Sequence, residues 1–320
     1  MKNRKCIICG SSDFISLYLT HDRMFDISGE YRVKKCKKCL LLFIDPQPTT
    51  AALNQHYPSK KYYSYTVSQK RNVFGVLRSY LVKNYYKPNL IASIFSKLVK
   101  NVPAMPSYKK NGKILDIGCG TGDTLILLQE LGWEAYGIEI DNNAVKTARK
   151  RGLTRVQLGT HKDIFKFPDN YFDSIRLYHV IEHLDDPLTC LELIHKKLKR
   201  DGELILGTPN YSSLTSKIFG KYWYNLDIPR HEFVFSPRNL QELVKKSGFK
   251  IGETEFCSAG GVIGSMQYII DALHITKIKL QNKFWIFLFF YPIEWFLDKI
   301  KIGDIFILRA SKLNKIDLVI

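Results

Sequence analysis

The sequence predicts an α/β protein in which a mostly parallel sheet lies between helices, preceded by a small cysteine-rich segment. Short apolar stretches alternate with amphipathic ones from about residue 113 onward, a pattern typical of parallel strands joined by helices. A glycine-rich turn follows the first of these strands. Two Cys-x-x-Cys pairs lie near the N-terminus. These three observations define the predicted organisation of the chain.

Length and charge limit the classes of function. The 320 residues suffice for one large α/β domain with a small appendage. With 48 Lys and Arg against 30 Asp and Glu, the net charge is +18, which favours nucleic acids, nucleotide-linked substrates or anionic membranes as partners. The first ten residues contain no apolar signal-peptide stretch. We therefore expect a cytoplasmic protein whose seven cysteines bind metal or remain free thiols.

Residues 1–60 are predicted to form a zinc-binding leader. Cys6, Cys9, Cys36 and Cys39 form two knuckles, and a hairpin between them would bring four thiolates together tetrahedrally. Four protein ligands leave no open position for water, so the predicted zinc is structural. Four unligated thiols or a redox dithiol are the alternatives.

Residues 61–110 are predicted to form a helical lid or linker. Apolar residues recur at mostly helical spacing from about residue 70. Four tyrosines come before residue 70, namely Tyr57, Tyr62, Tyr63 and Tyr65. They belong either to a linker packed on the main domain or to a substrate-lining loop.

The glycine-rich turn is the candidate cofactor site. Residues 114–117 predict a buried strand, after which Gly118, Gly120 and Gly122 allow a tight turn and close approach of a ligand. A helix is expected from Asp123, and its first N–H groups face the turn. Glu139 ends the second strand, where a carboxylate can accept both hydroxyls of a ribose. The alternative is a glycine-rich turn that binds nothing.

The Asp-x-Gly-x-Gly-x-Gly pattern of residues 116–122 resembles motif I of class I S-adenosylmethionine-dependent methyltransferases. The resemblance implies a Rossmann-like seven-stranded, mostly parallel sheet with an antiparallel last strand, here over residues 111–320. Further strands are expected near 154–158, 172–178, 203–210, 249–257 and 304–311, with a turn at 199–202. The adenine contact falls among Thr160, His161 and Asp163. The implied cofactor-binding residues are Asp116, Gly118, Cys119, Gly120, Thr121, Gly122, Glu139, Ile140, His161, Asp163 and His179.

Residues 178–187 resemble the segment after the fourth strand in quinone-type and sugar methyltransferases. His179 would border the methyl-donor pocket. His183 is a candidate base, although a Glu-His pair at a helix start is also a common structural feature.

His231 is the second candidate base. Residues 231–236 resemble the segment that carries the base histidine in sugar C-methyltransferases, where a glutamate precedes it, but Arg230 occupies that position here. An imidazole can accept the proton that the acceptor must lose. The alternatives are that His231 orients the substrate or caps the following helix.

Residues 261–303 are predicted to be an insertion before the last strand. Its aromatic run, residues 284–297, contains Pro292 and Glu294, and it is shorter than the about 20 apolar residues that span a bilayer. It forms either helices that cover the core or a second copy, or an interfacial hairpin at a membrane. Aromatic residues beside lysines favour contact with the inner face of the cell membrane.

Function is predicted as methyl transfer from S-adenosylmethionine to a small molecule. The leader and the Asp-Pro-x-Pro sequence of residues 45–48 resemble the zinc-binding leader of sugar and polysaccharide-cluster methyltransferases, which implies a sugar or glycan-precursor acceptor. A quinone or lipid O-methyltransferase and an rRNA methyltransferase are the alternatives, beside a scaffold without activity. Basic residues are scattered rather than grouped with stacking aromatics, which argues against nucleic acid.

Overall fold

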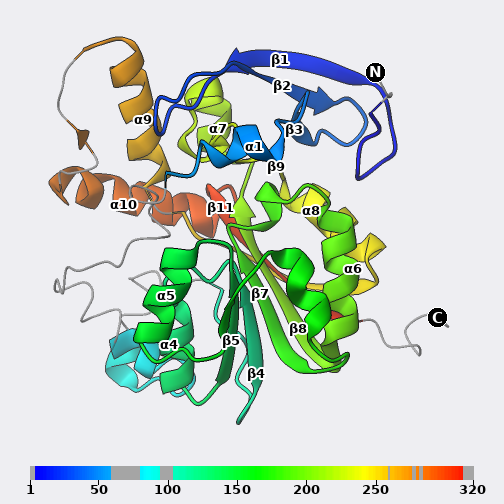
Figure 1. Ribbon diagram of the computed structural model, residues 1–320. Coiled ribbons are helices and arrows are strands. Elements are labelled where there is room, and N and C mark those ends of the chain that lie inside the picture. The colour runs from blue at the N-terminus through cyan, green and yellow to red at the C-terminus, as the bar shows by residue number, and fades with distance from the viewer. Residues whose placement is uncertain are drawn as a thin grey trace.

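The computed structural model describes residues 4–58, 80–93, 104–258, 260–275, 279–280 and 284–312. Two sheets and the helices around them make up this part of the chain (Figure 1). The strands are β1 (Phe14–Thr20), β2 (Tyr31–Cys36), β3 (Leu42–Ile44), β4 (Lys113–Ile117), β5 (Glu134–Glu139), β6 (Val156–Leu158), β7 (Phe172–Tyr178), β8 (Leu198–Pro209), β9 (Phe233–Val234), β10 (Phe249–Phe256) and β11 (Ile305–Lys312). The helices are α1 (Thr50–Asn54), α4 (Asp123–Glu130), α5 (Asn142–Lys150), α6 (Pro187–Lys197), α7 (Leu214–Phe219), α8 (Pro237–Lys246), α9 (Gly261–Ala272) and α10 (Phe284–Lys299), with short 3₁₀ turns η2 (His161–Lys166), η3 (Ile181–His183), η4 (Gly220–Tyr222) and η5 (Tyr224–Leu226).

The large sheet has seven strands in the order β10-β11-β8-β7-β4-β5-β6. Neighbours from β8 to β6 pair in parallel, whereas β11 is antiparallel to both β8 and β10. The predicted fold class is therefore confirmed, including the antiparallel last strand. The connections between successive parallel strands return the chain to the end of the sheet where each strand begins. The carboxyl ends of these strands therefore gather at the opposite edge.

Helices cover both faces of this sheet because alternate strand residues point to opposite sides. On one face, Ile114 packs in a cluster with the apolar stripes of α4 and α5. On the other, Leu115 and Ile117 pack in a cluster with residues of α6 and α8. The two helix layers are visible on either side of the strands in Figure 1.

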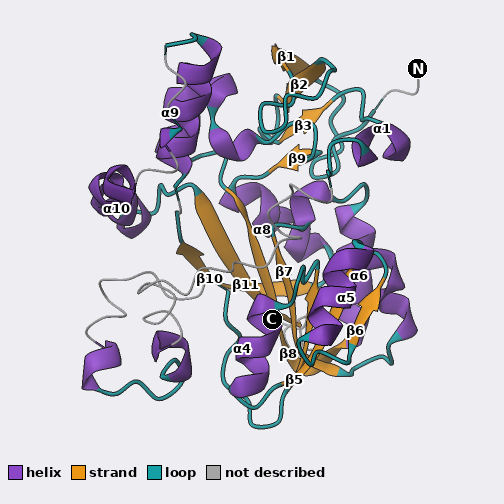
Figure 2. Cartoon of the chain, turned by 60° about the vertical axis from the view of Figure 1, so that its left-hand side comes forward, coloured by secondary structure: helices purple, strands orange, loops and turns teal. Residues whose placement is uncertain are grey.

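The small sheet, in the order β1-β2-β3-β9, is antiparallel and joins the leader to the large domain. Its fourth strand, β9, comes from residues far along the chain and pairs with β3. The backbone N–H of Glu232, just before β9, donates to the carbonyl of Glu182 in η3, which follows β7. The small sheet consequently lies over the carboxyl edge of the large sheet (Figures 1 and 2).

One expected turn differs in the structure, and one predicted segment lies mostly outside the described residues. The turn expected at 199–202 lies within β8, because Leu198 pairs with Phe172 and Glu203 with Ser174, so the residues between them bulge from a continuing strand. Most of the predicted lid, together with Tyr62, Tyr63 and Tyr65, lies outside the described residues. The domain limits near residues 60 and 110 stay predictions.

The expected insertion between β10 and β11 contains α9 and α10, which contact each other. In Figures 1 and 2 both helices project at one side of the large sheet. Within the described ranges, no helix is long and apolar enough to cross a bilayer.

Candidate active site

The loop between β4 and α4 is shaped to admit a ligand. Gly118, Gly120 and Gly122 all have positive φ, at 72°, 55° and 83°, a region that side chains with a Cβ rarely adopt. A Cβ on Gly118 would lie 2.5 Å from Cγ2 of Val180, and one on Gly122 would lie 2.0 Å from Cδ1 of Leu153. Conformation therefore favours glycine at all three positions, and space favours it at Gly118 and Gly122 as well. The loop is a cradle that fits S-adenosylmethionine.

Glu139 faces this loop from the end of β5. Its carboxylate accepts hydrogen bonds from the backbone N–H of Gly120 (2.8 Å) and of Asp141 (2.9 Å). Burial raises the pKa of Glu139, although these N–H donors oppose the shift. The acid expected to hold a ribose therefore lies beside the glycine turn, which fits that role.

Other predicted cofactor residues have varied surroundings. Both carboxylate oxygens of Asp116 accept from Arg176 of β7, at 2.9 and 2.8 Å, with both side chains buried. Asp116 thus ties β4 to β7 as well as preceding the glycine turn. Cys119 and Thr121 are buried within the loop, whereas Ile140 is exposed. Their contacts with the cofactor stay predictions.

The adenine candidates lie on η2, after β6. The side chain of Thr160 caps η2, and the Asp163 carboxylate accepts from the Thr160 backbone N–H at 2.7 Å in return. Asp163 therefore has a capping role. His161 is half-buried, 3.6 Å from an Asp185 oxygen. An adenine contact by His161 or Asp163 stays a prediction.

Three histidines surround Glu182 near the carboxyl end of β7. His179 Nδ1 lies 3.2 Å from a Glu182 carboxylate oxygen, and the rings of His183 and His231 are 4.7 Å apart between centroids. His231 Nε2 lies 3.9 Å from the same Glu182 oxygen. The structure thus brings together the two candidate bases, which are 48 positions apart in the printed sequence.

The hydrogen-bond partners of the two candidate bases show which ring nitrogen carries the hydrogen. His183 Nδ1 lies 2.8 Å from the carbonyl oxygen of Arg230 and 3.0 Å from the hydroxyl of Tyr57. His231 Nδ1 lies 3.1 Å from the carbonyl oxygen of Asn225. Because a carbonyl oxygen can only accept, each Nδ1 carries the hydrogen and donates it. Nε2 is then the ring nitrogen of each histidine that can accept a proton.

Glu182 is fully buried and ionised. Burial alone would raise its pKa, but His179, His183 and His231 together lower the pKa of Glu182 to about 2. Among the described residues, its second carboxylate oxygen has no hydrogen-bond partner. Glu182, His183 and His231 also bring one ligand atom each within 4.8 Å of one another, a set that could hold a metal ion.

The methyltransferase domain family matches residues 88–254 of the chain, which include the glycine loop, Glu139 and all three histidines. The chain belongs to this methyltransferase family. The glycine cradle expected to bind S-adenosylmethionine lies within the matched methyltransferase domain.

The chain is also similar to relatives with curated names. It is 30% identical over 146 residues to the ubiquinone biosynthesis O-methyltransferase of Cereibacter sphaeroides, covering 42% of this chain and 59% of that one. It is 32% identical over 112 residues to the demethylmenaquinone methyltransferase of Geobacillus stearothermophilus, covering 32% and 47%. The chain thus spans roughly half the length of these relatives. A solved methyltransferase from Archaeoglobus fulgidus aligns over 73% of this chain and 99% of its own, with 23% identity and a TM-score of 0.46.

A buried ionic network surrounds Arg230, the residue that precedes His231. The Arg230 guanidinium donates to Asp22 of the leader, at 2.8 and 2.9 Å, and to Asp227, at 3.1 and 3.0 Å from Nε. His56 also contacts Asp22, at 2.7 Å. Sequence analysis singled out neither Asp22 nor Asp227. Arg230 occupies the position where the resembled segment carries glutamate. That exchange indicated an altered charge next to His231, but it did not identify the acidic partners.

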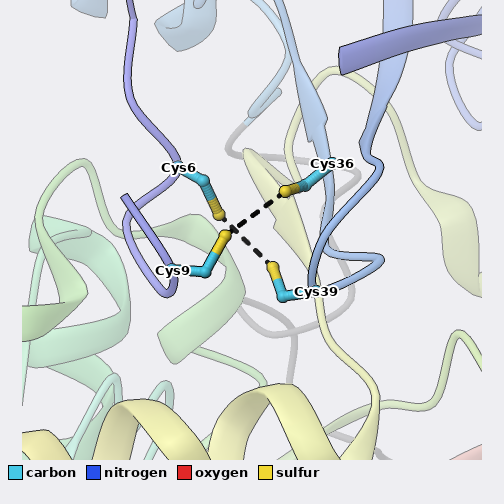
Figure 3. Close-up of side chains that lie close together, drawn as sticks. All are labelled: Cys6, Cys9, Cys36 and Cys39. Atoms are coloured by element: carbon cyan, nitrogen blue, oxygen red, sulfur yellow. Dashed lines mark hydrogen bonds between the residues drawn. The ribbon is translucent and has the colours of Figure 1, made fainter. Parts of the chain in front are cut away.

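The four leader cysteines lie together, as Figure 3 shows. Sγ atoms of Cys6 and Cys39 are 3.4 Å apart, and those of Cys9 and Cys36 are 3.5 Å apart. All four lie within 4.8 Å of one another, a spacing suited to a tetrahedral ion with sulfur ligands. The donor set therefore fits zinc.

A groove of about 1550 Å³ lies between the leader and α9. Its walls include Arg23, Tyr222 and Tyr268, with the Arg23 guanidinium 4.5 Å from the centre of the Tyr222 ring. A smaller hollow beside it reaches Asp227, whose carboxylate is 3.9 Å from His231 Nε2. This hollow has a volume of only about 10 Å³, and neither the histidine cluster nor the glycine loop contributes to the walls of the groove.

Proposed function

We propose that this enzyme transfers a methyl group to a hydroxyl of a small ring-bearing acceptor of the quinone-precursor type, with the His183–His231 pair accepting the proton. The name of the Cereibacter sphaeroides relative supports transfer to an oxygen. The names of that relative and of the Geobacillus stearothermophilus relative support a quinone-type acceptor. They favour it over the sugar or glycan precursor expected from the leader.

The histidine pair is the observation that carries the proposal. A hydroxyl is too weakly acidic to attack a methyl group efficiently unless a neighbouring group takes its proton. Nε2 of His183 and of His231 are lone-pair acceptors because both Nδ1 hydrogens are donated to carbonyls. The ionised Glu182 next to them stabilises the imidazolium that forms.

S-adenosylmethionine supplies an activated methyl group when bound. Gly118, Gly120 and Gly122 would hold it through backbone groups, and Glu139 would hold its ribose. His179, at positive φ (56°) directly after β7, has its Nδ1 3.2 Å from a Glu182 carboxylate oxygen. Binding and proton acceptance are thereby assigned to adjacent parts of one sheet edge.

We further infer that Cys6, Cys9, Cys36 and Cys39 hold a structural zinc ion. Four cysteine ligands leave no coordination position for a substrate. The metal then stabilises the leader, which supplies Asp22 to the network around Arg230.

The test is methyl transfer by purified enzyme to phenolic quinone precursors and, in parallel, to nucleotide sugars. His183→Asn and His231→Asn keep an N–H donor for the backbone carbonyl and remove the proton acceptor. We expect the variant that lacks the base to lose about 10²- to 10⁴-fold in kcat, with unchanged cofactor affinity in calorimetry. Full activity of both variants would exclude the histidine mechanism, and turnover of nucleotide sugars alone would exclude the proposed acceptor.

A further inference from the structure

The outer face of α10 is apolar although the helix contains two acids. Exposed side chains of Trp285, Phe289, Ile293, Phe296 and Ile300 recur at intervals of three and four residues, so they share one face of the helix. The exposed fractions of Trp285 and Phe289 are 76% and 69%. Large aromatic side chains are seldom left in water to this extent on a monomeric protein.

Both acids of α10 point the other way. Glu294 is buried and accepts from the backbone N–H of Gly260 and Val262, at 2.9 and 3.3 Å, where α9 begins. Asp298 accepts from the backbone N–H and the hydroxyl of Ser258. These bonds fix the rotation of the helix about its axis. The acids anchor it to the domain, and the aromatic face is turned outward without a negative charge of its own.

We propose that this face of α10 docks the enzyme on an anionic lipid bilayer, lying in the plane of the headgroups. Lys299 and Lys301 are exposed where the helix ends, and the whole chain carries a net charge of +18, which complements anionic lipid. An in-plane helix of this kind buries an aromatic face at the acyl boundary while basic residues contact headgroups. Pro292 lies on the same outward side.

Docking in this manner is independent of the acceptor's identity and of the histidine mechanism. It would nevertheless place α9 and the neighbouring groove near the lipid, since α9 packs against α10 and lines the groove.

Flotation of the full chain with vesicles tests the proposal without measuring activity. We expect the enzyme to float with vesicles containing phosphatidylglycerol and less with phosphatidylcholine alone. The double variant Trp285→Ser/Phe289→Ser should reduce the bound fraction by about tenfold or more. Phe165→Ser, on η2, is the control because Phe165 is also aromatic and is 61% exposed away from α10, and it should float like the native chain.

Circular dichroism and thermal melting of both variants check that each is folded. Absence of flotation of the native chain, or equal flotation of the double variant, would overturn the proposal. A native dimer in gel filtration that the double variant abolishes, without lipid binding by either, would also overturn it by assigning the face to a second copy of the chain.

Discussion

The imidazole of His231 is buried between carboxylates, yet it is uncharged. Burial, with the neighbouring His183, lowers the pKa of His231 to about 4, against the opposing effect of Asp227 and Glu182. In the unfolded chain the pKa is about 6.5. Because the unfolded state binds the proton first, stability is lost as pH falls from about 6.5 towards 4.

We predict that the native enzyme loses about 2 kcal/mol of unfolding free energy between pH 7 and pH 5 through this histidine. His231→Asn, which keeps a donor for the Asn225 carbonyl, should lack this loss. Burial raises the pKa of Glu232 and of Asp304 to about 6, and these carboxyls titrate in the same window in both proteins, so the effect of His231 is the difference between the two profiles. Urea unfolding at both pH values measures the difference. Glu182, whose pKa is about 2, loses its contribution to stability at lower pH. If the native enzyme and His231→Asn have identical stability profiles, folding does not lower the pKa of His231.

Gly118 provides a second test at the scale of one residue. Gly118→Ala would place a methyl group 2.5 Å from Val180 at a φ of 72°. We expect S-adenosylmethionine affinity in calorimetry to fall about tenfold or more, because the loop must move away from its ligand-binding conformation. Gly132→Ala has a similar φ, 89°, with no atom within 4 Å. It should cost about 1 kcal/mol of stability and leave affinity unchanged, whereas equal affinity losses would contradict the cradle.

At the scale of elements, the β1–β2 connection is tied to the segment before β9. Arg230 is buried and donates to Asp22 and Asp227, and both acids keep a lowered pKa because Arg230 outweighs their burial. The Arg230 carbonyl also fixes the tautomer of His183. The leader thereby positions a candidate base through one arginine.

Asp22→Ala should therefore destabilise the fold by about 3–5 kcal/mol, because a buried cation loses one of its partners. Asp22→Asn retains an acceptor for the backbone N–H groups of Met24 and Phe25, which Asp22 binds at 3.0 and 3.1 Å, and should cost less. In Asp22→Asn we expect slower methyl transfer with unchanged cofactor affinity. If the rate of methyl transfer and the cofactor affinity both match those of the native enzyme, the link between Arg230 and Asp22 serves stability alone.

Elements with local sequence patterns were predictable, and elements made by distant partners were not. The glycine turn, Asp123 at the start of α4 and the strand of residues 172–178 agree with the structure because each depends on local geometry and periodicity. The two residues of β9 are too few to show a period, and their partner β3 lies about 190 positions earlier. The pairing of Arg230 with Asp22 is likewise non-local, so its position next to a candidate base carried no indication of its partner.

At the scale of the whole molecule, leader and domain share one core. Cys6, Ile8, Cys36 and Phe43 belong to the same apolar cluster as Leu177 of β7 and Leu243 of α8. Asn239 of α8 donates to the Cys39 carbonyl at 2.6 Å, and Lys246 donates to that of Ile8. A change at the cysteine site should consequently reach the entire chain.

We predict that Cys36→Ser lowers bound zinc from about one ion per chain to almost none and shifts a single thermal transition to lower temperature. Elemental analysis and differential scanning calorimetry measure these effects. Cys257→Ser, at a half-buried thiol outside the cluster, should keep the zinc. Two separate transitions in the Cys36→Ser variant would indicate that the leader unfolds independently.

The pairing of β3 with β9 also has a consequence for the order of events on the ribosome. The leader is synthesised first, but the strand that covers the free edge of β3 is completed only at Val234, and the Asn239 and Lys246 contacts follow later still. An uncovered strand edge is prone to unwanted pairing. Early capture of metal by the two knuckles would hold the nascent hairpin in shape until its partner emerges, so zinc supply during translation would govern the yield of folded enzyme.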